Sequence, residues 1–194
     1  MKYAHPRPNT GNRSGGSLSW VPGLFAVCFV TILVESVMTF YRCRAASDAL
    51  EDALSGCAMA AALIDVQIYG STHDLVIGDA MAARDRYLDA LREDLGLDAQ
   101  MQPGPGSLID GPVTLELFCV YDLRGSEVTQ TALYPDGRYG QTTGVAGVLT
   151  APNGQPVPSA GIYGEISFPV RLPFGIRVMA RKSQLVTVNE RNSI

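Results

Sequence analysis

Histidine and cysteine are scarce in this 194-residue chain, and the scarcity limits the chemistry available to it. There are two histidines, His5 and His73, and no cysteines are spaced as C-x-x-C. Because a zinc site needs clustered thiolate or imidazole ligands, we expect no metal site. Asp74 follows His73, but adjacent loop residues rarely adopt the geometry of a base and its orienting carboxylate. We therefore predict no catalytic residue, no cofactor-binding residue and no metal ligand, and we expect a protein that is not an enzyme.

Basic residues are also few. The chain has 15 Lys and Arg against 19 Asp and Glu, which gives a net charge of -4. A nucleic-acid-binding protein needs a basic face for the phosphates, so we exclude nucleic acid as a partner. The stretch Gly104-Pro105-Gly106 lacks the lysine of a phosphate-binding loop. We predict no cofactor and no small-molecule substrate.

The four cysteines are too few and too unevenly placed for a disulfide framework. Cys28 lies inside an apolar segment, which leaves an odd number of cysteines in the rest of the chain. Cys57 and Cys119 could form a single bridge, or both could remain free thiols that pack as small apolar side chains. The sequence leaves both possibilities open and favours the second.

What the chain does have is one long apolar run. Residues 20–41, WVPGLFAVCFVTILVESVMTFY, contain a single ionisable side chain, that of Glu35. A helix of about 20 residues crosses the hydrocarbon core of a bilayer, and aromatic rings such as those of Trp20 and Tyr41 prefer its interfaces. A cleaved secretory signal would have an apolar region of about 7–15 residues that ends at small residues, whereas this run leads directly into Arg42. We therefore predict an uncleaved transmembrane helix over residues 20–41.

Basic side chains on the two sides of this run predict its orientation. Lys2, Arg7 and Arg13 precede the run together with the amino terminus, and Arg42 and Arg44 follow it. The positive-inside rule then favours a cytoplasmic N-terminus, with the C-terminal domain outside the cell membrane. The first nineteen residues are rich in Pro, Asn, Gly and Ser and show no apolar periodicity. We predict that residues 1–19 are a disordered cytoplasmic tail.

Glu35 is an ionisable residue within the predicted membrane-spanning segment, where such residues are rare. An ionised side chain costs about 2.5–3.5 kcal/mol at the centre of a span on insertion scales, and less near an interface. The carboxylate therefore either reaches interfacial water or faces a hydrogen-bond donor on a neighbouring helix. Because one span offers no such donor, the second possibility predicts assembly with other subunits.

The helical pattern continues past the apolar run, and we predict a helical extension over residues 42–69 that ends at Gly70. Apolar side chains recur in it at steps of three and four residues, and many are alanines, which allow another element to approach closely. This alanine stripe is either the inner face of the domain or a surface that packs against copies of itself or related subunits. The stripe comprises Ala46, Leu50, Ala53, Cys57, Ala60, Ile64 and Ile68. The candidate assembly residues are Glu35, Ala46, Ala49, Ala53 and Ala60.

Residues 70–194 are predicted to form an exterior α+β domain. Asp79 is a predicted N-cap for a second helix that stops at Gly96, and residues 100–112, rich in Pro and Gly, form a loop. A pattern of period two with β-branched residues then predicts strands. These cover residues 113–121, 127–134, 138–150, 162–171 and 176–188. Because the turns between them are short, we predict an antiparallel sheet of four or five strands.

The first part of the chain also resembles a known family. An apolar run with Val34-Glu35, the pair Phe40-Tyr41, arginines and then RAASDALEDALSGCAMAAALID resembles the TadE-like proteins. These are minor pilin or pseudopilin-like components of the Tad (tight adherence, Flp-type) pilus apparatus. The resemblance covers roughly residues 20–66, about a quarter of the chain. The succession of helices and then a sheet is also similar in outline to a pilin.

What this resemblance implies is membership of a surface pilus or a type II/IV-like secretion assembly. The partners would be the membrane and other pilus or secretion subunits, with self-association included. A pilin leader carries a glycine at its cleavage site and a glutamate five residues further on. Here Val21 follows Gly16 at that distance and Cys28 follows Gly23, so no cleavage-site residue is carried over. The alternative function is that of a stand-alone, membrane-anchored domain that binds an exterior ligand.

Overall fold

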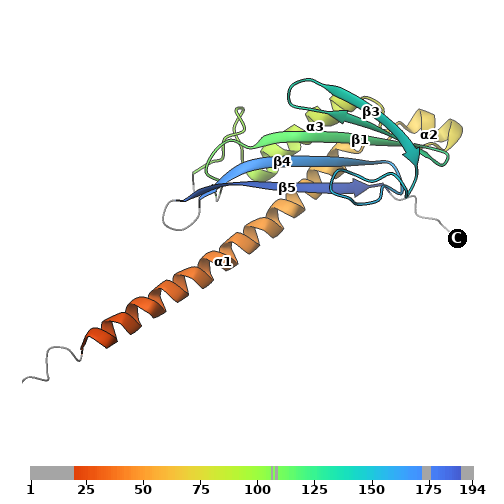
Figure 1. Ribbon diagram of the computed structural model, residues 1–194. Coiled ribbons are helices and arrows are strands. Elements are labelled where there is room, and N and C mark those ends of the chain that lie inside the picture. Colours follow the sequence, from red (N-terminus) through yellow and green to blue (C-terminus); the bar gives the residue numbers. More distant parts are fainter. Residues whose placement is uncertain (1–19, 106, 108, 172–175, 189–194) are drawn as a thin grey trace, which may run out of the picture. The chain divides into compact units, whose positions relative to one another are not determined.

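The computed structural model describes residues 20–105, 107, 109–171 and 176–188. The predicted cytoplasmic tail and the predicted turn at residues 172–175 lie outside these ranges. The chain divides into two compact units, Met1–Cys43 and Arg44–Ile194. Helix α1, Trp20–Ala61, contributes residues 20–43 to the first unit and residues 44–61 to the second. The predicted α+β fold is confirmed, with a long apolar N-terminal helix, two further helices and an antiparallel sheet (Figure 1).

Helix α1 ends earlier than the sequence pattern predicts, at Ala61 rather than near residue 69. The chain then breaks, and Asp65 caps a separate helix α2, Val66–Thr72, by accepting bonds from the backbone N–H groups of Gln67 at 2.9 Å and Ile68 at 3.2 Å. Asp65 also donates its own backbone N–H to the carbonyl oxygen of Val76, at 2.8 Å. The prediction of one continuous helix was wrong because a local N-cap interrupts it.

Two further details of this region differ from the prediction. Gly70 lies inside α2 and does not terminate a helix. The terminating residue is His73, which adopts the left-handed conformation with φ of 61° and donates its backbone N–H to the carbonyl oxygen of Tyr69. His73 is therefore a helix cap, and its ring packs edge-on against that of Tyr69, with centroids 5.7 Å apart.

The prediction for helix α3, Ala80–Leu95, is confirmed at both ends. The carboxylate of Asp79 accepts bonds from the backbone N–H groups of Met81 at 2.9 Å and Ala82 at 3.3 Å. Gly96 closes the helix in the left-handed conformation with φ of 60°, which costs little without a Cβ. An apolar face of three buried residues then packs this helix on the sheet. These residues are Ala83, Tyr87 and Leu91.

The sheet has five antiparallel strands, as the period-two pattern predicts. Their order across the sheet is β3-β2-β1-β4-β5. The strands are β1, Thr114–Arg124; β2, Glu127–Leu133; β3, Tyr139–Val145; β4, Gly161–Arg171; and β5, Arg177–Thr187. The predicted turn between β2 and β3 also forms, with Asp136 accepting the backbone N–H of Arg138 and Gly137 at φ of 79°. Consecutive strands pair as hairpins except that β4 returns beside β1.

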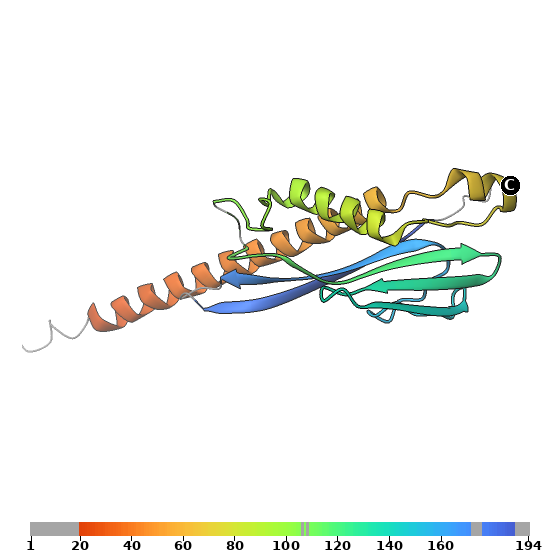
Figure 2. The same cartoon turned by 90° about the horizontal axis from the view of Figure 1, so that it is seen from above.

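Each face of the sheet has its own hydrophobic core. On one face, α3 and residues 44–61 of α1 pack over the strands (Figures 1 and 2). This core includes Leu54, Cys57, Tyr87, Leu91, Phe118, Val120, Ile162 and Ile166. The segment 146–157 covers the other face, held by bonds between Gly147 and Val157 and between Val157 and Leu149. The second core comprises Cys119, Tyr121, Val128, Ala132, Ala151, Val157 and Tyr163.

The two cores separate the cysteines for which the sequence left a bridge open. Cys57 lies in the core on the helix-covered face, and Cys119 lies in the core on the opposite face. Along β1 the side chains of Phe118 and Cys119 alternate between the faces, as successive strand residues must. Both thiols are free and buried, as the favoured interpretation expects.

Candidate functional site

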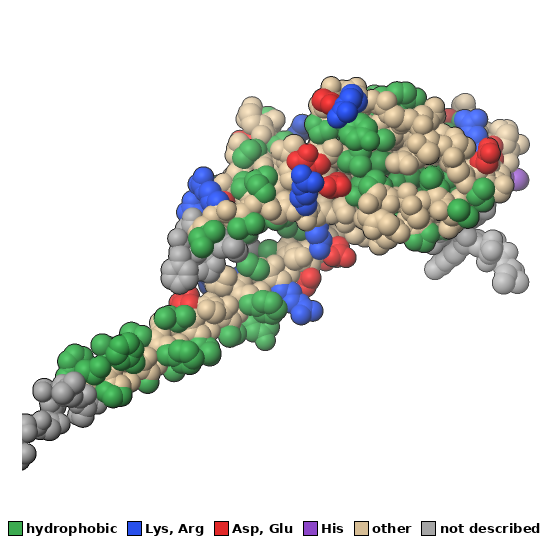
Figure 3. All heavy atoms as spheres, viewed as in Figure 1, with side chains coloured by type: hydrophobic (Ala, Val, Ile, Leu, Met, Phe, Trp, Pro, Cys, Tyr) green, Lys and Arg blue, Asp and Glu red, His purple; other side chains and the backbone are tan. Residues whose placement is uncertain are grey.

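The apolar half of α1, residues 20–43, carries four of its polar side chains along one line, while Ser36 lies beside that line and donates its hydroxyl to the carbonyl oxygen of Ile32. Cys28, Thr31, Glu35 and Thr39 recur at steps of three and four residues, the spacing that places side chains on one helical face. We name these four residues the polar line. Hydrophobic side chains cover much of the face of this half that Figure 3 shows, and large exposed ones include Phe25, Phe29 and Ile32. The sequence contained this signal, but the prediction singled out Glu35 alone.

The hydroxyl groups in this half are satisfied within the helix. Thr31 donates to the carbonyl oxygen of Val27 at 2.9 Å, and Thr39 donates to that of Glu35 at 2.8 Å. Such bonds to the residue four positions earlier allow Thr to lie in a helix that has no water around it. The carboxylate of Glu35 has no hydrogen-bond or ion-pair partner among the described residues. The polar line therefore contains one strong acceptor that has no partner among the described residues.

The second half of α1 uses its apolar side chains differently, because it covers the sheet. The buried side chains are Leu50, Leu54, Cys57, Ala58 and Ala61. The amine of Lys182 on β5 further fixes this half, at 2.9 Å from the carboxylate of Glu51 and 3.1 Å from the hydroxyl of Ser47. This part of α1 is therefore a structural element of the compact unit.

The buried residues of α1 and the predicted alanine stripe have only Leu50 and Cys57 in common. Of the candidate assembly residues on this half, Ala46 and Ala53 are half-buried at its border, and Ala49 and Ala60 are exposed. The stripe is therefore divided: Leu50 and Cys57 enter the core, whereas its alanines and its two isoleucines are half-buried or exposed. The exposed alanines leave a smooth helix surface that a second helix could approach closely.

Larger apolar side chains are exposed where α1 ends. Met59, Leu63 and Val66 keep 63%, 56% and 78% of their surface accessible. These three exposed apolar residues lie within eight positions of the sequence, and contiguous exposed apolar patches often mark interaction sites. Together with Ala60, they extend the exposed side of α1 toward α2.

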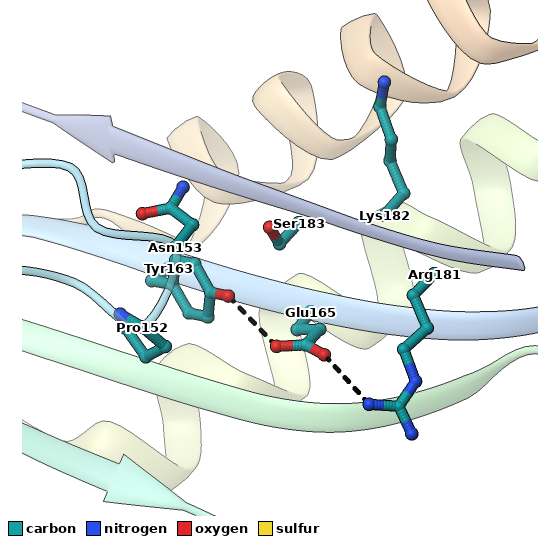
Figure 4. A pocket seen from close by; sticks show the side chains of 7 residues that line it. All are labelled: Pro152, Asn153, Tyr163, Glu165, Arg181, Lys182 and Ser183. Atoms are coloured by element: carbon teal, nitrogen blue, oxygen red, sulfur yellow. Dashed lines mark hydrogen bonds and ion pairs between the residues drawn. The ribbon is translucent and has the colours of Figure 1, made fainter.

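A small polar hollow lies on the sheet face opposite the helices (Figure 4). It has a volume of about 170 Å³. The Tyr163 hydroxyl donates to one Glu165 oxygen at 3.0 Å, and the Arg181 guanidinium lies 3.7 Å from the other. Burial raises the pKa of Tyr163 to about 12, and the Glu165 carboxylate adds to this. The lining residues are Pro152, Asn153, Tyr163, Glu165, Arg181, Lys182 and Ser183.

The chemistry of this hollow is limited. Its ionised groups are already paired with each other, and the Lys182 amine points away from it toward α1 (Figure 4). Pockets for drug-sized ligands have volumes of about 300–1,000 Å³, so the hollow is too small for a ligand of that size. Sequence reasoning did not find it, because the pairing of β4 with β5 brings Glu165 and Arg181 together.

The pair His73-Asp74 has a structural role. One oxygen of the Asp74 carboxylate accepts the backbone N–H of Gly125 at 3.0 Å, which holds the turn between β1 and β2. Within the described ranges, no three His, Cys, Asp or Glu side chains cluster in a way that could hold a metal ion.

Comparison with known proteins adds no assignment. No family model, no curated protein and no solved structure matches the chain. The function must therefore be inferred from the polar line, the exposed side of α1 and the fold.

Proposed function

We propose that this chain is a single-pass membrane protein and a TadE-like component of a surface pilus or a type II/IV-like secretion assembly. It would act through contacts between subunits and not through catalysis. The observation that carries the proposal is the polar line, with an unpartnered carboxylate on the one described helix that is long and apolar enough to span a membrane.

The membrane anchor follows from the length and surface of α1. Its apolar half exposes large side chains such as Phe25 and Phe29, with 71% and 67% of their surface accessible. Exposure to water would be unfavourable by roughly 25 cal/mol for each Å² of apolar surface, whereas lipid accepts these side chains. Internal bonding of the Thr31 and Thr39 hydroxyls suits the same environment.

Glu35 then provides the argument for partners. Ionisable side chains within a span usually face other protein or a water-filled cavity, because lipid offers them no hydrogen bond. With Thr31 and Thr39 on the same face, Glu35 presents a narrow polar surface that a donor on a second helix could meet. Such interhelical bonds contribute about 0.6–2 kcal/mol each.

The fold is compatible with this role. In the TadE-like and pilin-like outline, an N-terminal helix passes from an anchor to a packing element of a domain with a sheet. Here α1 supplies both parts, and Ala49 and Ala60 remain exposed on the second part. The positive-inside rule favours a cytoplasmic N-terminus, with residues 44–194 outside.

A second candidate function, an anchored domain that binds an exterior ligand, has one observation in its favour. The hollow around Glu165 and Arg181 presents polar groups on the surface of the sheet. Its small volume and internally paired charges make it a weak binding site, so the assembly function is better supported.

The proposed function can be tested by changing Glu35 in the full-length protein in its native membrane. Glu35→Leu should insert at least as well as the original chain, because leucine is favourable in lipid. It should nevertheless lose chemical crosslinking to the other envelope subunits. Glu35→Gln should retain part of the crosslinking, since an amide still forms hydrogen bonds.

The matched control is Val34→Leu, one position away and off the polar line. It should crosslink as the original chain does. Undiminished crosslinking of Glu35→Leu would mean that the carboxylate reaches interfacial water and contributes nothing to assembly, and the proposal would lose its main support.

A further inference from the structure

The two edges of the sheet differ in how well they are protected against pairing with another strand. Strand β5, at one edge, carries Arg177, Arg181 and Lys182. Charged side chains on an edge strand discourage a second strand from adding to it. Strand β3, at the other edge, has the sequence YGQTTGV, with no charge and no proline. The exposed backbone of β3 is therefore the less protected edge.

The register of β3 against β2 identifies the backbone groups that β3 leaves open. Arg138 accepts the N–H of Tyr134, and Ala146 donates to Ser126, so the hydrogen-bonded pairs at both ends of β3 involve its even-numbered neighbours. Since such pairs alternate along an antiparallel ladder, Gly140, Thr142 and Gly144 bond to β2. The odd-numbered residues must then direct their N–H and C=O groups outward. These residues are Tyr139, Gln141, Thr143 and Val145.

The open edge is complementary to itself. When two β3 strands are placed antiparallel with Thr142 opposite Thr142, each outward-facing residue meets another outward-facing residue. Tyr139 then lies opposite Val145, an aromatic and β-branched pair of the kind that stabilises sheets, and Gln141 lies opposite Thr143. Gly140 faces Gly144, and glycines in strands often mark a close approach of another backbone. All seven residues of each strand are paired, and no like charges meet.

The carbonyl oxygen of Val145 already accepts bonds from the N–H groups of Val148 and Leu149. In each copy, about six of the other outward-facing N–H and C=O groups can still form backbone hydrogen bonds to the second copy without disturbing the structure. The exposure of Tyr139 and Val145, 64% and 54%, leaves these side chains free to pack across the pair.

We propose that β3 is an interface between two copies of this chain, which pair edge to edge as antiparallel strands about a twofold axis at Thr142. A seven-residue edge is a small interface, and confinement to one membrane raises the effective concentration of the copies. The inference rests on the proposed membrane anchor in this one respect, that the anchor brings the copies together. The pairing would join the five-stranded sheets of two copies into one continuous sheet.

Disulfide crosslinking of the full-length protein in its membrane tests this pairing. At the axis the two Thr142 residues form a non-hydrogen-bonded pair with Cα atoms about 4.5 Å apart, a distance that a disulfide can bridge. In a chain with Cys28 and Cys43 replaced by alanine, Thr142→Cys should form a crosslinked dimer under mild oxidation. Met179→Cys is the control, because it is similarly exposed but lies on β5.

A second set of variants tests the edge and its register. Thr143→Pro removes an outward N–H without removing a bond to β2, so it should abolish the Thr142→Cys crosslink. Two double variants then test which residues face each other. Gln141→Lys with Thr143→Lys should prevent the crosslink, because like charges would meet on both sides of the axis. Gln141→Lys with Thr143→Glu should retain it, because each new lysine would lie opposite a new glutamate.

Folding is checked in every variant by the buried thiols of Cys57 and Cys119, which should stay unreactive. The proposal is overturned if Thr142→Cys crosslinks no better than Met179→Cys, or if the two double variants crosslink equally. Because Glu35 lies on a different surface, Glu35→Leu tests the proposed function separately. A crosslink that persists in Glu35→Leu supports the β3 interface even when contacts with other subunits are lost.

Discussion

The two halves of α1 place similar apolar residues in opposite surroundings. In residues 20–43 large side chains such as Phe25 and Phe29 are exposed, and no other described segment of their unit covers them. In residues 44–61 Leu54 and Cys57 are fully buried against the sheet and α3. The first half therefore has the exposed apolar surface of a helix long enough to span a membrane, whereas the second half buries its apolar side chains in its own domain.

This difference separates two kinds of structural constraint on one helix. Substitutions in the second half should change the free energy of unfolding of the compact unit, because they change its core. Substitutions in the first half should leave that free energy unchanged and affect insertion or assembly. The same type of substitution should therefore have different effects on stability in the first half of α1 and in the compact unit.

The largest effect is expected from a glycine in the sheet. A Cβ at Gly164 would clash with the hydroxyl oxygen of Tyr87 and lie 2.5 Å from the ring carbon that carries it. Tyr87 is fully buried and cannot move aside without leaving the core. We expect Gly164→Val to destabilise the compact unit by about 5 kcal/mol or more, the upper range for single substitutions. Thermal unfolding of the full chain in detergent, followed by the near-ultraviolet signal of tyrosine, measures this.

The matched change is Gly23→Val in the apolar half. A Cβ at Gly23 would meet no atom within 4 Å, so the same substitution should leave the melting temperature unchanged. A stable Gly164→Val chain would show that the Tyr87 ring has freedom that the packing does not suggest, and it would weaken the contrast between the two regions.

A smaller effect is expected from removing leucine side chains. Leu54 has no accessible surface, so Leu54→Ala should cost about 3 kcal/mol and lower the melting temperature by roughly 6–12 °C. Leu33→Ala in the apolar half should leave the melt unchanged. Ala49→Leu should also leave it unchanged, since Ala49 is exposed. A large loss of stability in Ala49→Leu would assign this alanine to the core and remove it as an assembly residue.

Much of the fold was predictable, because its signals are local. Asp79 and Gly96 bound α3 through cap chemistry that involves neighbouring residues, and alternating residues in β1 and β4 reveal strands. The break after Ala61 was missed although Asp65 is a good N-cap, because the apolar spacing continues across it. The phase of the buried helix face was also not predictable, since the sheet decides which side of an alanine-rich helix is covered.

The candidate surfaces were less predictable than the fold. Glu35 was recognised because it breaks an apolar run, which is a local signal. The open groups of β3 depend on its register against β2, and the hollow depends on the pairing of Glu165 with Ser183 across two strands. Such pairings join residues far apart in sequence, and a pattern along the chain does not determine them.

The pH dependence of stability compares a buried cysteine of the compact unit, Cys57, with a cysteine of the first unit, Cys43. Burial, with a further contribution from the nearby Asp94 carboxylate, raises the pKa of the Cys57 thiol from 9.0 to about 12. The folded chain thus retains a proton that the unfolded chain loses above pH 9, so this contribution to stability is complete below pH 9 and is lost as the pH rises toward 12. Cys57→Ala should flatten the decline in melting temperature between pH 9 and pH 12.

Cys43 provides the matched control for this prediction, because it lies in the first unit and outside both cores. Cys43→Ala should leave the alkaline decline as it is. Part of the decline should persist even in Cys57→Ala, since the pKa of Tyr163 is also raised, from 10.0 to about 12. An unchanged slope in Cys57→Ala would mean that this thiol does not contribute to the alkaline loss of stability.

The smallest effect concerns the hydroxyl of Tyr87. It is buried against Gly164, and it has no hydrogen-bond partner among the described residues. Because a buried hydroxyl without a partner costs about 1–3 kcal/mol, Tyr87→Phe should leave stability unchanged or raise it by about 1 kcal/mol. Tyr163→Phe should instead lower it by about 1 kcal/mol, since it removes the bond to Glu165.

Tyr41→Phe, at the end of the apolar half, completes this set and should not change the melt at all. The three tyrosines then compare a buried hydroxyl without a partner, a buried hydroxyl bonded to Glu165 and a hydroxyl outside the compact unit. A marked loss of stability in Tyr87→Phe would require a partner for that hydroxyl, such as an ordered water molecule between α3 and β4. The close approach of Tyr87 to Gly164 would then be a polar contact, and the severe effect expected for Gly164→Val would have to be attributed partly to its loss.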